Sequence, residues 1–89
     1  MKRIKRDRTF KKQFKRRISP DDKLVKQFKE RLELFIAGKL SYPLNDHALH
    51  GKLEDKRAFW VAGGIRVIYV ETEGFIIFLD IGSHNQVHE

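Results

Sequence analysis

Apolar residues in the first half of the chain recur every three or four positions, which is the period of an α-helix. Phe10, Phe14 and Ile18 fall four apart and predict a short helix whose other positions are mostly basic. Residues 24–36 continue with apolar positions at the same spacing and predict a longer helix. Between them, residues 19–22 (SPDD) form a helix start, with a serine suited to the cap and a proline suited to the first turn. We expect two helices packed as a hairpin.

The second half of the chain changes to short runs rich in β-branched and aromatic residues, which are typical of strands. These runs cover residues 57–62, 65–70 and 75–81. Gly63-Gly64 separates the first two runs, residues 72–74 (TEG) separate the last two, and both linkers favour hairpin turns. The pattern therefore predicts an antiparallel meander of three strands.

Together these elements predict an α+β fold with two N-terminal helices packed on a small antiparallel sheet. Residues 2–6 are a possible short edge strand of that sheet. Consecutive apolar residues in the last two strands indicate a sheet that is partly buried on both faces. A length of 89 residues suits one domain, and we expect residues 1–89 to form it.

The turn at Gly63-Gly64 decides which side chains share a face of the predicted sheet. A two-residue turn pairs Val61 with Arg66 and Arg57 with Val70. Because side chains alternate along a strand, we expect Arg57 and Arg66 to emerge on the same face. Two guanidinium groups among apolar neighbours are costly in a core but natural at a phosphate site.

Positive charge is concentrated at the start of the chain. Residues 1–39 carry 15 Lys and Arg against 5 Asp and Glu, whereas residues 40–89 carry 4 against 7. A solvated helix face is usually mixed in sign, so this excess favours binding to a polyanion such as RNA. The predicted RNA-binding residues are Lys11, Lys12, Lys15, Arg16, Arg17, Lys52 and Lys56.

The composition of the chain bears on its cellular compartment and on which kinds of metal or disulfide site it can form. The chain has no cysteine, which excludes disulfides and Cys-based zinc sites and fits a reducing cytosol. No apolar run reaches the length of about 20 residues needed to cross a bilayer, and no apolar segment of a signal peptide follows the basic start. The apolar positions are committed to a core, which disfavours membrane-surface binding. We expect a soluble cytoplasmic protein that binds no membrane.

Three short motifs follow one another along the chain: DHALHG at residues 46–51, GIRVIY at 64–69 and IGSHNQVH at 81–88. Together with the order of helices and strands, they resemble the RelE/ParE superfamily of toxins, and more narrowly its YafQ and RelE branches. The resemblance covers nearly the whole chain. It implies a ribosome-dependent endoribonuclease that cuts mRNA without a metal or other cofactor and is held in check by a cognate antitoxin protein.

The resemblance also implies a reaction and a set of residues. The RNA 2′-hydroxyl attacks its own neighbouring phosphate, which requires a base, an acid and cations around the phosphorane. By matching position, Arg66 falls at a phosphate-stabilising arginine and Arg57 at an active-site lysine of RelE. His84 falls at the histidine of the YafQ G-[ST]-H motif, His88 at a C-terminal aromatic position, and His47 at the YafQ histidine before L-x-G. These five are the predicted catalytic residues.

The chain departs from the family pattern at three positions. YafQ places a histidine and an aspartate in the region of Trp60 and Gly64, and a second RelE lysine falls at Phe59. The sequence therefore does not assign the acid and the base to particular histidines. The four histidines lack the carboxylate or cysteine pattern of zinc sites, so we expect no bound metal.

Three alternatives to an active nuclease remain open. The first is a ParE-like gyrase inhibitor, which has the same fold, although the histidine-rich C-terminal segment argues against it. The second is a non-catalytic module that binds RNA or the ribosome through the basic helices. The third is a decayed toxin that binds the ribosome but does not cut.

Overall fold

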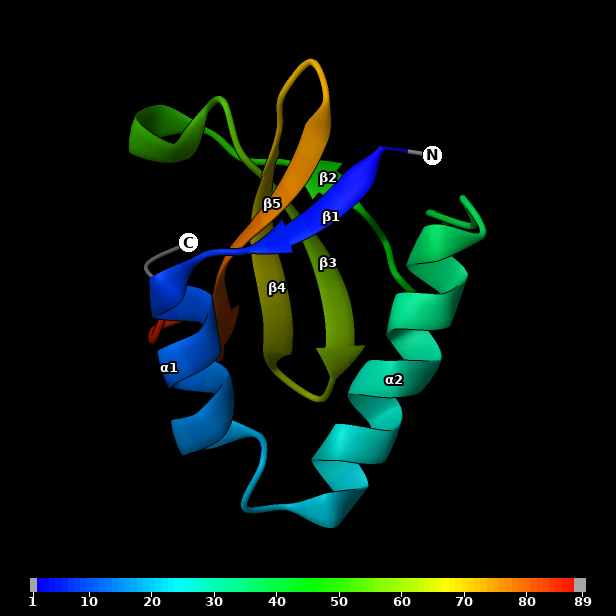
Figure 1. The fold of residues 1–89 in the computed structure, drawn as a ribbon, viewed down its shortest axis with the longest axis vertical. Helices are drawn as coiled ribbons and strands as arrows, with labels where there is room; N and C mark the ends of the chain where they lie inside the picture. The colour runs from blue at the N-terminus through cyan, green and yellow to red at the C-terminus, as the bar shows by residue number, and fades with distance from the viewer. Residues whose placement is uncertain (1, 88–89) are drawn as a thin grey trace.

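Residues 2–87, the part of the chain that the computed structural model describes, form two α-helices beside one five-stranded sheet (Figure 1). The α+β fold expected from the sequence is confirmed. Within residues 2–87 no helix is long and apolar enough to span a membrane. In chain order the elements are β1 (Arg3–Arg6), α1 (Arg8–Arg17), α2 (Asp22–Ile36), β2 (His47–Ala48), the 3₁₀ helix η1 (Gly51–Leu53), β3 (Arg57–Ala62), β4 (Ile65–Glu71) and β5 (Phe75–Gly82).

The sheet has the strand order β1-β5-β4-β3-β2. Strands β3, β4 and β5 form the predicted antiparallel meander, and the predicted N-terminal edge strand is present as β1. Strand β1 runs parallel to β5, so the sheet is mixed rather than purely antiparallel. At the opposite edge lies β2, which the sequence pattern did not indicate because it is only two residues long.

Both helices begin at an aspartate that accepts hydrogen bonds from the first turn. Asp7 accepts from the backbone N–H of Thr9, and Asp21 accepts from two backbone N–H groups of α2. The cap of α2 therefore lies two residues later than the serine that the sequence favoured. The hydroxyl of Ser19 instead donates to the carbonyl oxygen of Lys15 at the end of α1 (2.8 Å).

The two helices cover one face of the sheet but follow different strands. Helix α1 packs along β5 and α2 packs along β3, so the two helices diverge over different strands of that one face (Figure 1). They contact each other through aromatic rings, with the centroids of Phe14 and Phe28 4.9 Å apart. The expected helical hairpin is thus an open one, in which each helix is stabilised mainly by the sheet.

The sheet is buried on both faces, as the runs of consecutive apolar residues predicted. Beneath the helices lies the larger core, whose buried aromatic members are Phe10, Phe28, Phe35, Phe59, Tyr69 and Phe78. A smaller core lies on the opposite face and consists of Leu49, Ala58, Ile68 and Val87, with Leu53 packed against it. Leu49 and Leu53 of this smaller core also line a cavity on the same face.

The hairpin between β3 and β4 contains a β-bulge. Ala62 pairs with Ile65 across the expected two-residue turn, but the next pair is Trp60 with Arg66. Val61 is therefore the extra residue that has no opposite partner, and the register beyond it is shifted by one. A shift of one residue moves every later side chain to the other face.

Candidate active site

Arg57 and Arg66 lie on opposite faces of the sheet, so the expectation that they share a face is wrong. The bulge in β3 is the physical reason. Arg57 pairs with Tyr69 and belongs to the helix-covered side, whereas Arg66 belongs to the side of Ile68 and the smaller core. Of the two arginines, only Arg66 meets a histidine in the described structure.

Arg66 contacts His84 on the face of the sheet opposite the helices. Arg66 pairs with Gly82 across β4 and β5, and His84 follows two residues later. Nη1 of Arg66 lies 3.2 Å from Nδ1 of His84. A guanidinium group only donates, so Nδ1 of His84 accepts, and the proton of the neutral ring lies on Nε2. His84 therefore presents an N–H donor beside a permanent positive charge.

His84 lines a cavity of about 610 Å³ together with two further histidines and a lysine. His47 belongs to β2, His50 follows it, and Lys52 lies in η1. Leu49 and Leu53 also line this cavity. Its volume is within the usual range for a small-molecule site.

The His47 ring is oriented by the backbone next to it. Its Nδ1 lies 2.9 Å from the carbonyl oxygen of Asn45. Because a carbonyl only accepts, Nδ1 carries the proton of the neutral ring, and the basic lone pair is on Nε2. His47 and His84 thus have opposite tautomers, which suits one to accept a proton and the other to donate one.

A second, smaller cavity of about 190 Å³ adjoins this site. His47, Trp60 and Arg66 all line it, so His47 is common to both cavities. Trp60 is half-buried, and its Nε1 donates to the carbonyl oxygen of Gly63 at 2.6 Å. The register shift pairs Trp60 with Arg66 across β3 and β4.

Arg57 is held by a buried carboxylate that the sequence analysis did not single out. Nε of Arg57 donates to one oxygen of Asp46 at 2.7 Å, and the hydroxyl of Tyr69 donates to the other. The Asp46 side chain is only 1% exposed. Burial, with the bond to Asp46, raises the pKa of Tyr69, while the same carboxylate raises the pKa of Arg57. This network fixes the start of the segment that carries His47.

The side chains of Arg17 and Gln86 lie close to the backbone at Gly82 of the G-S-H motif. A Cβ atom there would lie 2.5 Å from Nη1 of Arg17 and 2.8 Å from Oε1 of Gln86. Nη1 of Arg17 donates to the carbonyl oxygen of Ile81 at 2.9 Å and lies 3.5 Å from Asp80. Glycine therefore lets the end of α1 bind the end of β5 directly before His84.

The predicted RNA-binding residues on α1 differ in their exposure and in their partners. Lys11, Lys12, Lys15 and Arg16 are exposed on α1, whereas the guanidinium of Arg17 is engaged with β5. Arg17 therefore has a structural role and does not belong with the exposed group.

Three candidate residues remain. Lys52 and Lys56 lie between β2 and β3, and His88 is not among the residues that the structure describes. Lys52 lines the histidine cavity, and Nζ of Lys56 pairs with its neighbour Asp55 at 2.9 Å. The structure thus brings together His47, His84, Arg66 and Lys52, and it separates Arg57 from them.

A family model described as "Bacterial toxin of type II toxin-antitoxin system, YafQ" matches residues 2–89. The chain belongs to the YafQ toxin family. Comparison with curated proteins gave no match. The family assignment agrees with the resemblance seen in the sequence motifs.

Solved structures show the same fold as this YafQ-family chain. YafQ from E. coli strain BL21(DE3) has a TM-score of 0.80 at 22% identity over 100% of both chains. A copper-bound mutant toxin from Helicobacter pylori has a TM-score of 0.77 at 24% identity, covering 98% of this chain and 99% of that one. The E. coli DinJ–YafQ toxin–antitoxin complex matches with a TM-score of 0.76 at 23% identity over 100% of both chains. Within residues 2–87 of this chain, no three His, Cys, Asp or Glu side chains are grouped to hold a metal ion.

Proposed function

We propose that this YafQ-family toxin is a ribosome-dependent endoribonuclease that cuts mRNA by attack of a ribose 2′-hydroxyl on the neighbouring phosphate. The observation that carries the proposal is the hydrogen bond from Arg66 to His84 beside a cavity that His47 also lines. Transphosphorylation of RNA needs a base, an acid and a cation. These three side chains supply one of each.

The opposite tautomers of the two histidines suggest which is the base. In the proposed reaction Nε2 of His47 takes the proton of the 2′-hydroxyl as the 2′-oxygen bonds to phosphorus. The bond from phosphorus to the 5′-oxygen breaks, and Nε2–H of His84 protonates that leaving oxygen. The products are a 2′,3′-cyclic phosphate and a free 5′-hydroxyl. Arg66 and Lys52 stabilise the negative charge of the phosphorane.

Arg57 and His88, which the family resemblance also matches, are not part of the set formed by His47, His84 and Arg66. Arg57 lies on the helix-covered face and bonds to Asp46, so we assign it to positioning the His47 segment rather than to the phosphate. His88 is proposed as an additional proton-transfer residue on the strength of the sequence match alone.

We propose that the exposed cations of α1 and those near the cavity hold ribosomal RNA. Lys11, Lys12, Lys15 and Arg16 project from one helix, so they form a continuous positive surface. Such a surface gives sequence-independent affinity that falls as salt rises, because binding releases the counterions of the RNA. Lys52 lines the histidine cavity on the opposite face of the sheet, and we propose that Lys52 and Lys56 contact the RNA there, nearer the scissile phosphate.

We further propose that a cognate antitoxin neutralises the toxin. The family consists of toxins of type II toxin–antitoxin systems, and E. coli YafQ has been solved in a toxin–antitoxin complex with DinJ. Expression of the chain alone in bacteria should stop growth and bulk translation. Normal growth with confirmed soluble protein would count against an active toxin.

Primer extension on an mRNA incubated with the purified chain tests the nuclease proposal, with and without translating ribosomes. We expect new 5′ ends only when ribosomes are present. Ribosome binding without new ends would leave a binding module or a decayed toxin. Inhibition of DNA supercoiling by gyrase, without any cut mRNA, would support the ParE-like alternative instead.

A further inference from the structure

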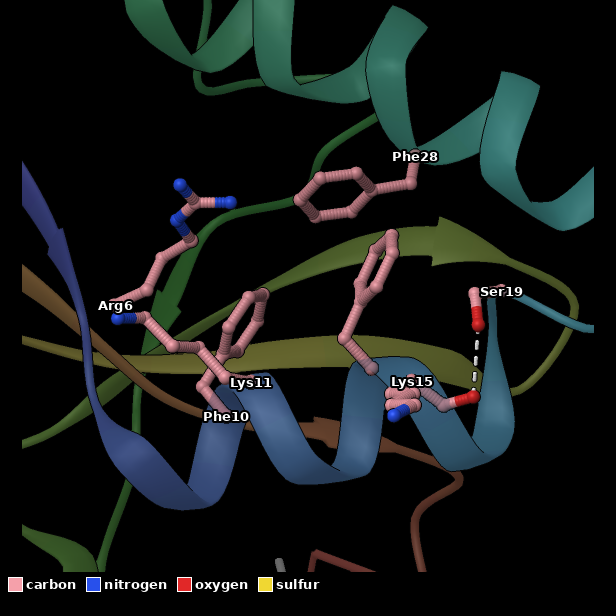
Figure 2. Close-up of a pocket in the computed structure, with 7 residues that line it drawn as sticks. Arg6, Phe10, Lys11, Lys15, Ser19 and Phe28 are labelled. Atoms are coloured by element: carbon pink, nitrogen blue, oxygen red, sulfur yellow. Dashed lines mark hydrogen bonds between the residues drawn. The ribbon is translucent and has the colours of Figure 1, made fainter.

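Most of the aromatic rings in residues 2–87 are covered, including those beside the basic helix α1. The cavity between α1 and α2 has lysines at its edge, and Figure 2 shows Phe28 pointing across it toward α1. Phe10 and Phe28 are only 1% and 7% exposed, and the ring centroids of Phe14 and Phe28 are 4.9 Å apart. Because these rings are covered, α1 offers RNA positive charge but no surface on which its bases can stack.

Tyr42, in the loop between α2 and β2, is by contrast 85% exposed. Leu44, two residues later, is fully buried, and its carbonyl oxygen accepts from the backbone N–H of Trp60 at 2.8 Å. These two anchors hold the loop against β3 and leave the Tyr42 ring in solvent. The ring therefore adds little to the core and is available to a ligand.

Tyr42 and Trp60 line one cavity of about 290 Å³, together with Pro43 and Asn45. The indole is fixed in position, with the guanidinium carbon of Arg31 4.8 Å from its ring centroid. Trp60 is half-buried and still lines the cavity, so part of its ring is accessible from there. Two aromatic side chains thus face one cavity outside both cores.

This cavity is continuous in its lining with the candidate active site. Trp60 and Asn45 also line the cavity of about 190 Å³ to which His47 and Arg66 contribute. The carbonyl oxygen of Asn45 in turn accepts from Nδ1 of His47. An RNA chain whose phosphate lies at Arg66 therefore has the Tyr42–Trp60 cavity next to it.

The polar groups around the two aromatic side chains suit a nucleobase. None of the described residues that line either cavity is acidic. Asp46, the carboxylate next to Asn45 in the chain, is 1% exposed and bonded to Arg57. Asn45 is exposed, and its side-chain amide both donates and accepts hydrogen bonds, so it can pair with the edge of any base.

We propose that Tyr42 and Trp60 form a subsite that stacks the base of a nucleotide next to the scissile phosphate, a step that rests on the proposed function above. The base lies in the cavity against the phenol ring and the indole, and the amide of Asn45 pairs with its edge. Every base has a π-face, so stacking of this kind tolerates any sequence. The subsite therefore holds the mRNA in place rather than selecting a codon.

Trp60 is the only tryptophan of the chain, so its fluorescence reports on this subsite alone. The probe is a trinucleotide of 2′-deoxyadenosine, which cannot be cut because it lacks the 2′-hydroxyl. A trinucleotide with the same phosphates and abasic sugars is the matched ligand. We expect the deoxyadenosine trinucleotide to quench the Trp60 fluorescence through stacking and the abasic one to leave it nearly unchanged.

Variants of Tyr42 then test the second ring, with Trp60 fluorescence as the readout. Tyr42→Ala should raise the Kd of the deoxyadenosine trinucleotide by about tenfold, because one stacking partner is lost. Tyr42→Phe keeps a ring and should stay within about threefold of wild type. Ile36→Ala removes another exposed apolar side chain, one that lines neither cavity, and should also stay within about threefold. Circular dichroism should show that all three variants fold.

Equal quenching by the two ligands would overturn the proposal, because Trp60 would then sense only the phosphates. Equal effects of Tyr42→Ala and Ile36→Ala would overturn it as well, and so would the absence of quenching up to a ligand concentration of about 1 mM. None of these measurements involves cleavage. Base-dependent quenching in a chain that cuts no mRNA would support the subsite and refute the nuclease, whereas cleavage without such quenching would refute the subsite alone.

Discussion

The guanidinium of Arg66 donates a hydrogen bond to Nδ1 of His84, with 3.2 Å between the two nitrogens. This bond places the proton of the neutral imidazole on Nε2. In His47 the carbonyl oxygen of Asn45 accepts from Nδ1, which leaves the lone pair on Nε2. The two histidines line one cavity and have opposite neutral tautomers. We therefore expect the cleavage rate to depend on each of them in a different way.

Replacement of Arg66 by alanine should slow cleavage by about 10²–10³, because a donor at a developing charge is lost. Arg66→Lys should recover only part of the rate, since an ammonium group lacks the planar fork of a guanidinium. Single-turnover cleavage of mRNA on programmed ribosomes measures the rate. Ribosome binding by either variant should stay within about threefold of wild type, since Arg66 acts mainly on the transition state. Wild-type cleavage by Arg66→Ala would remove it from the site.

Loss of either proton-transfer histidine should cost a factor of about 10²–10⁴ in the same assay. The pH–rate profile then distinguishes their roles. His47→Ala should remove the rise in rate on the acidic side, and His84→Ala should remove the fall on the alkaline side. His50→Ala serves as a comparison from the same cavity and should cost less than about tenfold. Exchanged profiles would mean that the acid and base assignments are reversed.

Arg57→Ala should reduce the rate less than Arg66→Ala, and its effect should be shared with Asp46→Ala. Because the two residues act as a bonded pair, the double variant should be no slower than the slower single variant. Both single variants should also lower the free energy of unfolding, by about 1–3 kcal/mol. A fully additive double variant would show that Arg57 contacts the substrate independently.

Stability in alkali should depend on Tyr69. Its raised pKa means that the folded chain keeps the hydroxyl protonated where the unfolded chain has begun to ionise. The stabilisation that Tyr69 contributes is complete when the pH is below the ordinary tyrosine pKa of about 10. It is lost as the pH rises from there toward the pKa of Tyr69 in the folded chain. The free energy of unfolding should fall by up to about 1.4 kcal/mol per pH unit above about pH 10. Urea unfolding should show a shallower fall in Tyr69→Phe, and identical slopes would contradict the buried hydroxyl.

The elements of this fold were predictable from the sequence because their signals are local. The spacing of Phe10 and Phe14 predicts a helix, and Gly63-Gly64 predicts a turn whose two residues the structure confirms. The face occupied by Arg57 was not predictable from the same pattern. The bulge lies at Val61, and no glycine or proline at that position indicates it in the sequence. One extra residue in the strand is enough to move the Arg57 side chain to the other face of the sheet.

The site residues that sequence reasoning missed depend on distant partners. Asp46 is buried because Arg57 and Tyr69, which are 11 and 23 residues away in sequence, both donate to it. Its position directly before His47 in the DHALHG motif was the available signal. Arg17 resembles its basic neighbours in sequence, and only the packing of α1 on β5 shows that its charge is used internally.

The central claim is that His84 and Arg66 act on a phosphate of mRNA in the ribosome. Its most direct test is a chemical analysis of the ends made in single-turnover cleavage on programmed ribosomes by the wild-type chain and by His84→Ala. We expect the wild-type chain to leave a 2′,3′-cyclic phosphate and a 5′-hydroxyl, and His84→Ala to form the same ends about 10²–10⁴ times more slowly. A 5′-phosphate product, or an unchanged rate in His84→Ala, would contradict the account.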